Sequence, residues 1–197
     1  MKTIMLTTAL VLASTAAFAG DFDANEVVLS AQSGGLKFAL GTVEGDLTSV
    51  ATTANFANYQ LGIFESSADA TVTYGRVTDT LSAELAYNLS TDLNDATSLY
   101  GTAAVAYTAP TADLADGDVT VAPTVGVSYA ATESLSVFGD VTYTWNATND
   151  WDTEGGSLAV GADYAVSETV SVTPSVIHTF NTGADATNLK LEATLRF

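Results

Sequence analysis

The side chains that carry out most acid–base and nucleophilic reactions are scarce in this chain. Cysteine is absent, and His178 is the single histidine among 197 residues. A catalytic site based on histidine would therefore have to be centred on His178. The chain contains no G-x-S-x-G, H-E-x-x-H or Walker-type glycine sequence to complete such a site. Because His178 alternates with the apolar Val176 and Phe180, we expect an interfacial side chain, no enzyme activity and no cofactor.

Acidic residues are the other candidates for chemistry, as ligands of a hard cation. Asp150, Asp152 and Glu154 alternate before Gly155, as oxygen ligands do in the first part of a calcium loop. Such a loop ends in a glutamate at its twelfth position, where this chain has Gly161. We therefore expect no specific metal site, with these three residues as weak candidates, and an acidic surface that attracts divalent ions. A second acidic cluster consists of Asp113, Asp116 and Asp118.

The composition excludes several other classes of protein. The chain has 5 Lys and Arg against 23 Asp and Glu, a formal net charge of −18. Binding to nucleic acid needs clustered basic residues, so we expect no nucleic-acid partner. The lack of cysteine excludes a disulfide framework and a thiolate zinc site. Only 14% of the residues are charged, about half the usual share for a soluble protein.

The first nineteen residues have the pattern of a secretory signal peptide. Lys2 provides a positive start, residues 4–11 are mostly apolar, and Ala17-Phe18-Ala19 has the small-x-small form of a cleavage site. We therefore expect residues 1–19 to be removed after export through the inner membrane. No later segment approaches the roughly 18 to 20 apolar residues of a spanning helix, so this chain would have to cross a membrane with strands.

From about residue 35 onward, apolar and small polar residues alternate with the period of a β-strand. In one segment, Leu135, Val137 and Val141 fall on one face, and Ser136 and Asp140 fall on the other. The pattern predicts ten strands, at about 35–43, 57–65, 70–76, 81–89, 98–108, 119–129, 135–145, 158–164, 170–180 and 189–197.

The predicted connections alternate in length. The turns near 131–134 and 166–168 are short, whereas the loops at 109–118 and 146–156 are longer, polar and acidic. Residues 44–56 form a further predicted surface loop. Antiparallel hairpins that cross a bilayer have tight turns on one side and longer loops on the other.

Two architectures can use this alternation. A soluble sandwich points its apolar face inward, whereas a membrane barrel points it to lipid and encloses polar side chains. The polar faces here are mostly Thr, Ser, Ala and Gly, which suit the interior of a narrow barrel better than a soluble surface. We therefore expect an all-β, antiparallel, up-and-down transmembrane β-barrel over residues 35–197, with about ten strands and alternatives of eight or twelve. Residues 20–34 are expected to form an N-terminal leader or, through Glu26–Gln32, an extra strand.

Aromatic residues on the apolar faces fall near strand ends, at one rim for alternate strands and at the other rim for the strands between. Aromatic rings with a polar edge favour the membrane–water interface. We therefore predict two aromatic girdles, formed by Tyr87, Tyr129, Tyr164 and Phe197 at one rim and by Tyr107, Tyr143, Trp145 and Phe180 at the other.

The opposite faces predict the lining of a lumen. If its carboxylates line an open path, they concentrate cations and make the pore weakly cation-selective. If its basic side chains pair with carboxylates across the lumen, the barrel is plugged and the pairs are structural. Strand stagger decides between these alternatives, and both stay open at this point. The predicted charged lumen residues are Lys37, Glu84, Asp140, Asp163, Lys190, Glu192 and Arg196.

The signal peptide, the turn sequence from Tyr129 to Leu135 and the ending Leu191-x-Ala193-x-Leu195-x-Phe197 resemble those of small outer-membrane β-barrel proteins of Gram-negative bacteria, including short porin-like ones. The resemblance implies an outer-membrane location, in contact with lipid and lipopolysaccharide. It also implies that Leu191, Leu195 and Phe197 form an assembly signal for the barrel-assembly machinery.

The pattern and the resemblance together favour porin-like passive diffusion of small solutes or cations. A closed barrel with a structural or surface-interaction role through its acidic external loops is the alternative. A soluble secreted β-sandwich is the third alternative. The oligomeric state stays open.

The face assignment makes a prediction about insertion. Val127→Arg places a charge on the expected lipid face and should impair insertion by about 2–4 kcal/mol near the middle of the bilayer. Thr124→Arg, on the expected lumen face, should be milder. Equal tolerance of both variants in a membrane-insertion assay would reject the assignment.

Overall fold

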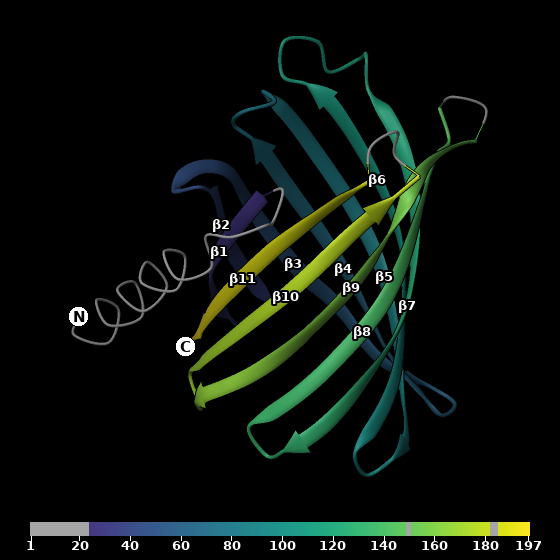
Figure 1. Cartoon of the computed structure of the whole chain (residues 1–197). Helices are drawn as coiled ribbons and strands as arrows, with labels where there is room; N and C mark the ends of the chain where they lie inside the picture. Colours follow the sequence, from purple (N-terminus) through teal and green to yellow (C-terminus); the bar gives the residue numbers. More distant parts are fainter. Residues whose placement is uncertain (1–23, 149–150, 182–184) are drawn as a thin grey trace.

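The computed structural model describes residues 24–148, 151–181 and 185–197, which form eleven β-strands in one closed barrel (Figure 1). This barrel confirms the predicted fold class, and its strand count lies between the expected ten and the alternative of twelve. The strands are β1 (Ala24–Ser33), β2 (Leu36–Val43), β3 (Asp46–Leu61), β4 (Phe64–Gly75), β5 (Thr80–Asn94), β6 (Thr97–Pro110), β7 (Asp118–Thr132), β8 (Leu135–Asn146), β9 (Asp152–Ser167), β10 (Val170–Phe180) and β11 (Ala186–Arg196).

The odd number of strands determines how the barrel closes. Consecutive strands pair antiparallel around the whole wall, but β1 pairs with β11 in parallel. Ala24–Ser33 therefore lies in the wall as the closing strand. We call the β1–β11 contact the seam. Parallel pairs have slanted hydrogen bonds and are slightly less stable per residue than antiparallel pairs.

The connections differ at the two ends of the barrel, which we call the upper and lower rims after their positions in Figure 1. At the upper rim the connections are mostly longer, up to residues 111–117 between β6 and β7. The positive φ of Gly34 (57°) and Gly62 (66°) fits the tight turns at the other rim. The structure thus confirms the predicted alternation of short turns and longer loops. At the lower rim, where β11 also ends, each connection has two residues: 34–35, 62–63, 95–96, 133–134 and 168–169.

Two predictions between residues 44 and 65 are wrong. The predicted loop 44–56 is a short turn followed by most of β3, and the predicted strand 57–65 spans the turn between β3 and β4. The alternation in β3 is weak because the small residues Ala and Thr occupy both of its faces. In addition, Phe56 forms a bulge, since the pairing with β4 skips it. A bulge shifts the period by one residue and hides the strand from a pattern of strict alternation.

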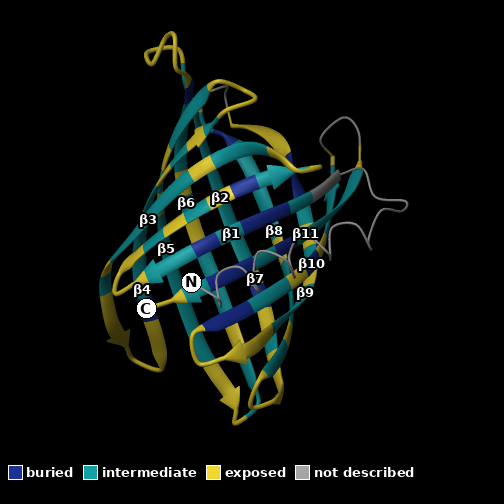
Figure 2. Cartoon of the chain, turned by 90° about the vertical axis from the view of Figure 1, so that its left-hand side faces the viewer, coloured by how far each residue is buried: buried dark blue, intermediate teal, exposed yellow. Residues whose placement is uncertain are grey.

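The barrel lacks the packed apolar core that a soluble sandwich would need. Among the described residues, no large side chain is fully buried, and exposed and half-buried positions alternate along the strands (Figure 2). Large apolar side chains such as Val125 (67% exposed) and Leu85 (60%) point outward. Because one sheet closes on itself, the alternative of a β-sandwich is wrong. The described part of the chain has no helix that is long and apolar enough to span a membrane.

The parallel seam makes a prediction that distinguishes eleven strands from ten or twelve. Ser30 and Thr194 are register partners, with their hydroxyl oxygens 2.8 Å apart. In a chain without other cysteines, the Ser30→Cys/Thr194→Cys variant should form a disulfide on oxidation. The denatured, cross-linked chain is circular over most of its length and should run faster on a non-reducing gel.

A matched variant controls for accidental contact. Leu195 neighbours Thr194 but points to the opposite face of β11, because side chains alternate along a strand. Ser30→Cys/Leu195→Cys should therefore stay uncross-linked. Absence of a cross-link in Ser30→Cys/Thr194→Cys, or equal cross-linking of both pairs, would contradict the parallel closure.

Candidate functional site

The two faces of most strands differ in chemistry. On β2, Leu36, Phe38 and Leu40 are exposed on the outer surface. Lys37 and Ala39, which lie between them, are half-buried on the lumen side. This apolar-out, polar-in alternation makes the lumen the candidate functional site.

Hydroxyl groups join neighbouring strands along the lumen wall. The Oγ1 atoms of Thr53 and Thr71 are 2.9 Å apart between β3 and β4, and those of Thr124 and Thr142 are 2.6 Å apart between β7 and β8. Each pair satisfies one hydroxyl donor and adds a cross-strand contact. The wall between the charged residues is therefore polar but neutral.

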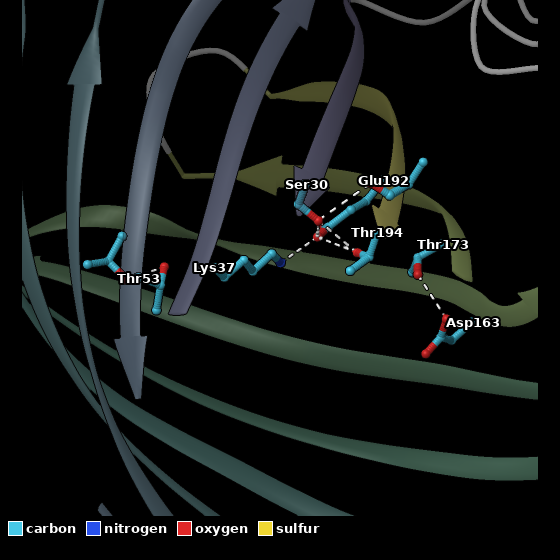
Figure 3. Close-up of polar contacts among 9 residues, drawn as sticks. Ser30, Lys37, Thr53, Asp163, Thr173, Glu192 and Thr194 are labelled. Atoms are coloured by element: carbon cyan, nitrogen blue, oxygen red, sulfur yellow. Dashed lines mark hydrogen bonds and ion pairs between the residues drawn. The ribbon is translucent and has the colours of Figure 1, made fainter. Parts of the chain in front are cut away.

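A cluster of four polar side chains holds the seam from inside; we call Ser30, Lys37, Glu192 and Thr194 the seam cluster. Lys37 Nζ lies 2.5 Å from Glu192 Oε1, so the ion pair spans from β2 across β1 to β11 (Figure 3). The Ser30 hydroxyl donates to Glu192 Oε1 at 3.4 Å and shares a 2.8 Å hydrogen bond with Thr194. These contacts add charge-assisted bonding to the parallel pair.

The direction of the Lys37–Glu192 ion pair decides whether it plugs the lumen. Lys37–Glu192 is the only ion pair within the described residues. Its partners belong to strands on either side of β1, so the pair runs along the wall and does not cross to the opposite side. It stabilises the seam and leaves the centre of the lumen unbridged by charge.

A network of side-chain amides surrounds Asp69 on β4. Asn55 Nδ2 donates to one carboxylate oxygen at 2.9 Å, and Asn88 Nδ2 donates to the other at 2.7 Å. Asn58 donates in turn to Asn55, and the Thr102 hydroxyl donates to Asn88 Oδ1 at 2.8 Å. The network ties β3 to β6 and orients Asp69 without any basic partner.

Two aromatic side chains lie inside the lumen above glycines. The Tyr100 ring covers Gly126 on the neighbouring β7, and its hydroxyl donates to Asp140 Oδ2 on β8 at 2.9 Å. The Phe138 ring covers Gly161 on β9 in the same way. A glycine at each of these positions leaves room for the ring to lie against the wall, because a Cβ there would overlap the ring atoms.

The other predicted lumen residues occupy the same side of the wall. Asp163 on β9 accepts a hydrogen bond from the Thr173 hydroxyl at 3.1 Å (Figure 3). The register pairs Glu84 with Thr71 and Ala106, Lys190 with Glu26 and Ser175, and Arg196 with Gln32.

The charges of the lumen are segregated around the wall. The basic residues Lys37, Lys190 and Arg196 lie on β2 and β11, the two neighbours of β1. We call this sector, from β11 through β1 to β2, the basic sector. Carboxylates without a basic residue on the same strand occupy the rest of the wall, at Asp69, Glu84, Asp140 and Asp163.

Sequence reasoning missed three lumen residues that matter to this arrangement. Asp69 precedes the predicted strand 70–76, although its alternation with Ala70, Thr71 and Val72 would have placed it on the polar face. Tyr100 alternates with Thr102 on the polar face of β6, but aromatic residues were expected on the lipid face. Glu26 lies on β1, for which the sequence pattern allows either an N-terminal leader or an extra strand.

The predicted upper girdle residues pack against one another or against a loop. The ring centroids of Tyr143 and Trp145 are 5.0 Å apart, and those of Tyr143 and Phe180 are 6.4 Å apart. The Tyr107 hydroxyl donates to the Leu114 carbonyl oxygen at 2.6 Å, which fixes the β6–β7 loop to the wall.

The predicted lower girdle residues Tyr129, Tyr164 and Phe197 lie near the lower ends of their strands, whereas Tyr87 lies midway along β5, because this strand continues to Asn94 beyond its predicted end at residue 89. Tyr129 and Tyr164 are exposed, and the Tyr87 hydroxyl lies 3.1 Å from that of Tyr59. Phe197, also the last residue of the predicted assembly signal, is 76% exposed. Its backbone N–H donates to the Gln32 carbonyl oxygen at 3.0 Å, so the chain end stays attached to β1.

The other residues of the predicted assembly signal belong to β11. Leu191 packs with Val27 and Ala193 at the seam, and Leu195 pairs with Val170 on β10. The assembly role of this segment stays a prediction.

Two of the three candidate metal ligands, and the histidine, lie within the described residues. Glu154 accepts a hydrogen bond from Asn146 at 2.9 Å, Asp152 is exposed at the start of β9, and Asp150 lies outside the described residues. Within the described ranges, no three His, Asp or Glu side chains gather closely enough to hold a metal. His178 Nδ1 lies 3.0 Å from Thr187 Oγ1 on the neighbouring strand.

The upper rim is strongly acidic. Arg76 is the only basic residue in the described connections at this end. Carboxylates at or beside the same connections are Glu44, Asp46, Asp79, Asp113, Asp116, Asp118, Asp152, Glu154 and Asp185.

Comparison with solved structures gives the class of fold. The chain is similar to the NanC porin, with a TM-score of 0.63 and 10% sequence identity over 82% of this chain and 85% of that one. It also matches the outer-membrane channel DcaP of Acinetobacter baumannii, with a TM-score of 0.39 and 13% identity over 79% of this chain and 56% of that one. No family model matches the chain, and no curated protein matches it. The likeness to NanC shows the fold, which is a closed β-barrel like that of this porin.

The contact between Tyr100 and Gly126 makes a prediction about stability. Gly126→Ala should displace the ring and break its hydrogen bond to Asp140, which costs about 1–3 kcal/mol of unfolding free energy. Gly139→Ala is the matched control, because its Cβ would meet nothing closer than 3.7 Å. Denaturant unfolding in detergent micelles measures both effects.

The Tyr100→Ala variant tests whether the ring causes the loss of stability in Gly126→Ala. In Tyr100→Ala the ring is gone, so adding Gly126→Ala should cost almost nothing further. A full cost of Gly126→Ala in that background would show that the ring is not the cause.

Proposed function

We propose that the chain is an outer-membrane porin that allows passive diffusion of small polar solutes with a preference for cations. The observation that carries this proposal is the alternation on most strands, with large apolar side chains exposed outside and hydroxyl, amide and charged side chains inside. An apolar outer surface on a closed sheet suits a hydrocarbon surrounding, since every strand has a partner on both sides. The same surface would be costly in water.

The size of the barrel supports passage of small solutes only. Strands about 4.8 Å apart and tilted by about 40° give eleven strands a backbone radius of about 11 Å. Inward side chains reduce this further, and Tyr100 and Phe138 narrow the lumen on the β6–β9 side. The lumen is therefore closer to that of a small selective barrel than to the wide channels of barrels with sixteen or more strands.

The charges support a preference for cations. The acidic upper rim and the four carboxylates outside the basic sector attract cations to the mouth and along most of the wall. In the basic sector, Glu192 of the seam cluster neutralises Lys37, which is one of the three basic side chains of the lumen. A mobile cation therefore meets favourable potential over most of its path.

The difference between the two rims supports one orientation of the barrel in the membrane. We place the lower rim in the periplasm, because it has the tight turns and the end of β11, and the upper rim outside the cell. The acidic loops would then face lipopolysaccharide and share its divalent ions. In this proposal, residues 1–19 direct export, and Leu191, Leu195 and Phe197 address the chain to the barrel-assembly machinery.

A closed barrel with a structural or surface-interaction role is the second candidate. The inward rings of Tyr100 and Phe138 favour it, because bulky groups block a narrow barrel easily. A porin should conduct ions across a bilayer, whereas a closed barrel should not.

Single-channel recording in planar bilayers tests the proposal. The purified barrel should give a steady ohmic current, and a KCl gradient should give a reversal potential on the cation-selective side. The variant Asp113→Asn/Asp116→Asn removes two charges from the upper mouth and should lower the cation-to-anion permeability ratio by roughly twofold. Ser134→Asn at the lower rim, which changes no charge, should leave the ratio unaltered.

The recording also decides between the candidates. Silence from a barrel that is folded, as judged by heat-modifiable migration on gels, would overturn the porin proposal in favour of the closed barrel. A preference for anions would overturn the selectivity.

A further inference from the structure

Two polar cavities adjoin each other on the lumen wall near the lower rim. The larger, of about 610 Å³, is lined by residues from β1 to β4, and the smaller, of about 260 Å³, by residues from β3 to β6. Asn58 lines both cavities, so together they form one elongated hollow, which we call the polar groove. Its volume is in the range of cavities that hold small molecules.

Each half of the polar groove contains one carboxylate from β4. Asp69 lines the larger cavity, and Glu65 lines the smaller one. The two residues are four positions apart on the same face of the strand, so their Cα atoms are about 13 Å apart. Glu65 is the second residue of β4, next to the lower turn. The two carboxylates therefore follow one another along the path from the lower rim into the lumen.

Neither carboxylate has a basic partner. Within the part of the chain that the structure describes, the only ion pair is Lys37–Glu192. Lys37 also lines the larger cavity, but its ammonium is directed across β1 to Glu192 and is neutralised there. The free charge of the polar groove is therefore negative, and it is located at two separate points.

A row of neutral polar side chains separates the two carboxylates. The register places Asn58, Ser67 and Asn88 side by side on β3, β4 and β5, halfway between Glu65 and Asp69. Asn88 Nδ2 donates to the Ser67 hydroxyl at 3.3 Å. Asn58 uses its Nδ2 in a hydrogen bond to a neighbouring amide, which leaves its carbonyl oxygen as an acceptor in the groove. The row thus offers acceptors to a bound cation but adds no third charge.

The Asp69 carboxylate is oriented before any ligand arrives. Asn55 and Asn88 each donate to one of its oxygens, at 2.9 and 2.7 Å. A carboxylate has about four acceptor sites, so about two remain for a ligand. Fixing the carboxylate in advance lowers the cost of binding.

We propose that the polar groove binds linear diamines and polyamines, with one ammonium at Asp69 and another at Glu65. This inference rests on the proposed function, and it names a class of cation that the pore retains on its way through. An extended chain of eight carbons, with bonds of about 1.5 Å, separates two terminal nitrogens by about 11 Å, close to the spacing of the two carboxylates. Once one ammonium is bound, the other binds as part of the same molecule, which raises the affinity without any new kind of contact. A short diamine reaches only one carboxylate at a time.

Two diamines of equal charge test the proposal on the folded barrel: 1,8-diaminooctane and 1,4-diaminobutane. Added on the side of the lower rim, the longer diamine should halve the single-channel potassium current at about tenfold lower concentration than the shorter one. Glu65→Gln removes one end of the bridge with little change of shape, and should make the two diamines equally effective to within about twofold. Asp69→Asn should have the same effect from the other end.

Asp163→Asn is the matched control, because it removes the same charge from the lumen wall outside both cavities. It should lower the selectivity for cations but preserve the advantage of the longer diamine. If that advantage persisted in Glu65→Gln and Asp69→Asn, the proposal would be overturned, since the apolar chain of the diamine would then be its cause. Equal block by both diamines in the unaltered barrel would also overturn it, in favour of a plain cation site.

Calorimetric titration of the same diamines into the barrel in non-ionic detergent separates this inference from the proposed function. Binding of 1,8-diaminooctane that Glu65→Gln weakens would support the polar groove as a site even in a barrel that conducts no current. A conducting barrel that neither binds 1,8-diaminooctane nor is blocked by it would overturn the site and leave the porin proposal intact.

Discussion

Backbone pairing is the constraint on which the rest of this structure depends. A strand surrounded by hydrocarbon has no water for its N–H and C=O groups, so each strand needs a partner on both sides. The eleven strands meet this need by closing one sheet, and the closure uses a parallel pair because the strand number is odd. Once the sheet is closed, a side chain has two directions only, and the apolar-out, polar-in alternation follows.

The parallel pair is also where the wall receives its strongest support from side chains. Slanted hydrogen bonds make this pair slightly weaker than its neighbours, and the seam cluster adds an ion pair and shared hydroxyl bonds there. Lys37 of the seam cluster also belongs to the basic sector, whose other basic residues, Lys190 and Arg196, lie on β11. The support of the closure and the separation of charge around the wall therefore share one residue, Lys37, and both are located at the seam.

The parts of the fold that were predictable from the sequence are those with strong alternation. From β5 onward, Val, Leu and Tyr on one face and Thr, Ser and Gly on the other give the strands and the tight turns directly. The pattern fails in β3, where both faces carry small residues and Phe56 bulges out of register. It could not show that Lys37 meets Glu192, because a contact between strands 155 residues apart depends on stagger and closure. Asp69 was missed because the predicted strand begins one residue too late, at residue 70. Tyr100 was missed because aromatic residues were expected outside, whereas Gly126 leaves space for its ring inside the lumen.

The seam also has a consequence for the order in which the barrel assembles. Neighbouring hairpins join residues close in the chain, whereas Ser30 and Thr194 are 164 positions apart. Bringing such distant segments together costs more conformational entropy than zipping one hairpin onto the next, and topologies rich in distant contacts fold slowly. Hairpins from β1 to β11 can thus form in succession, and the ring is complete only when the final strand returns to the first. The ion pair between Lys37 and Glu192 is then a late event, and its formation marks a finished barrel.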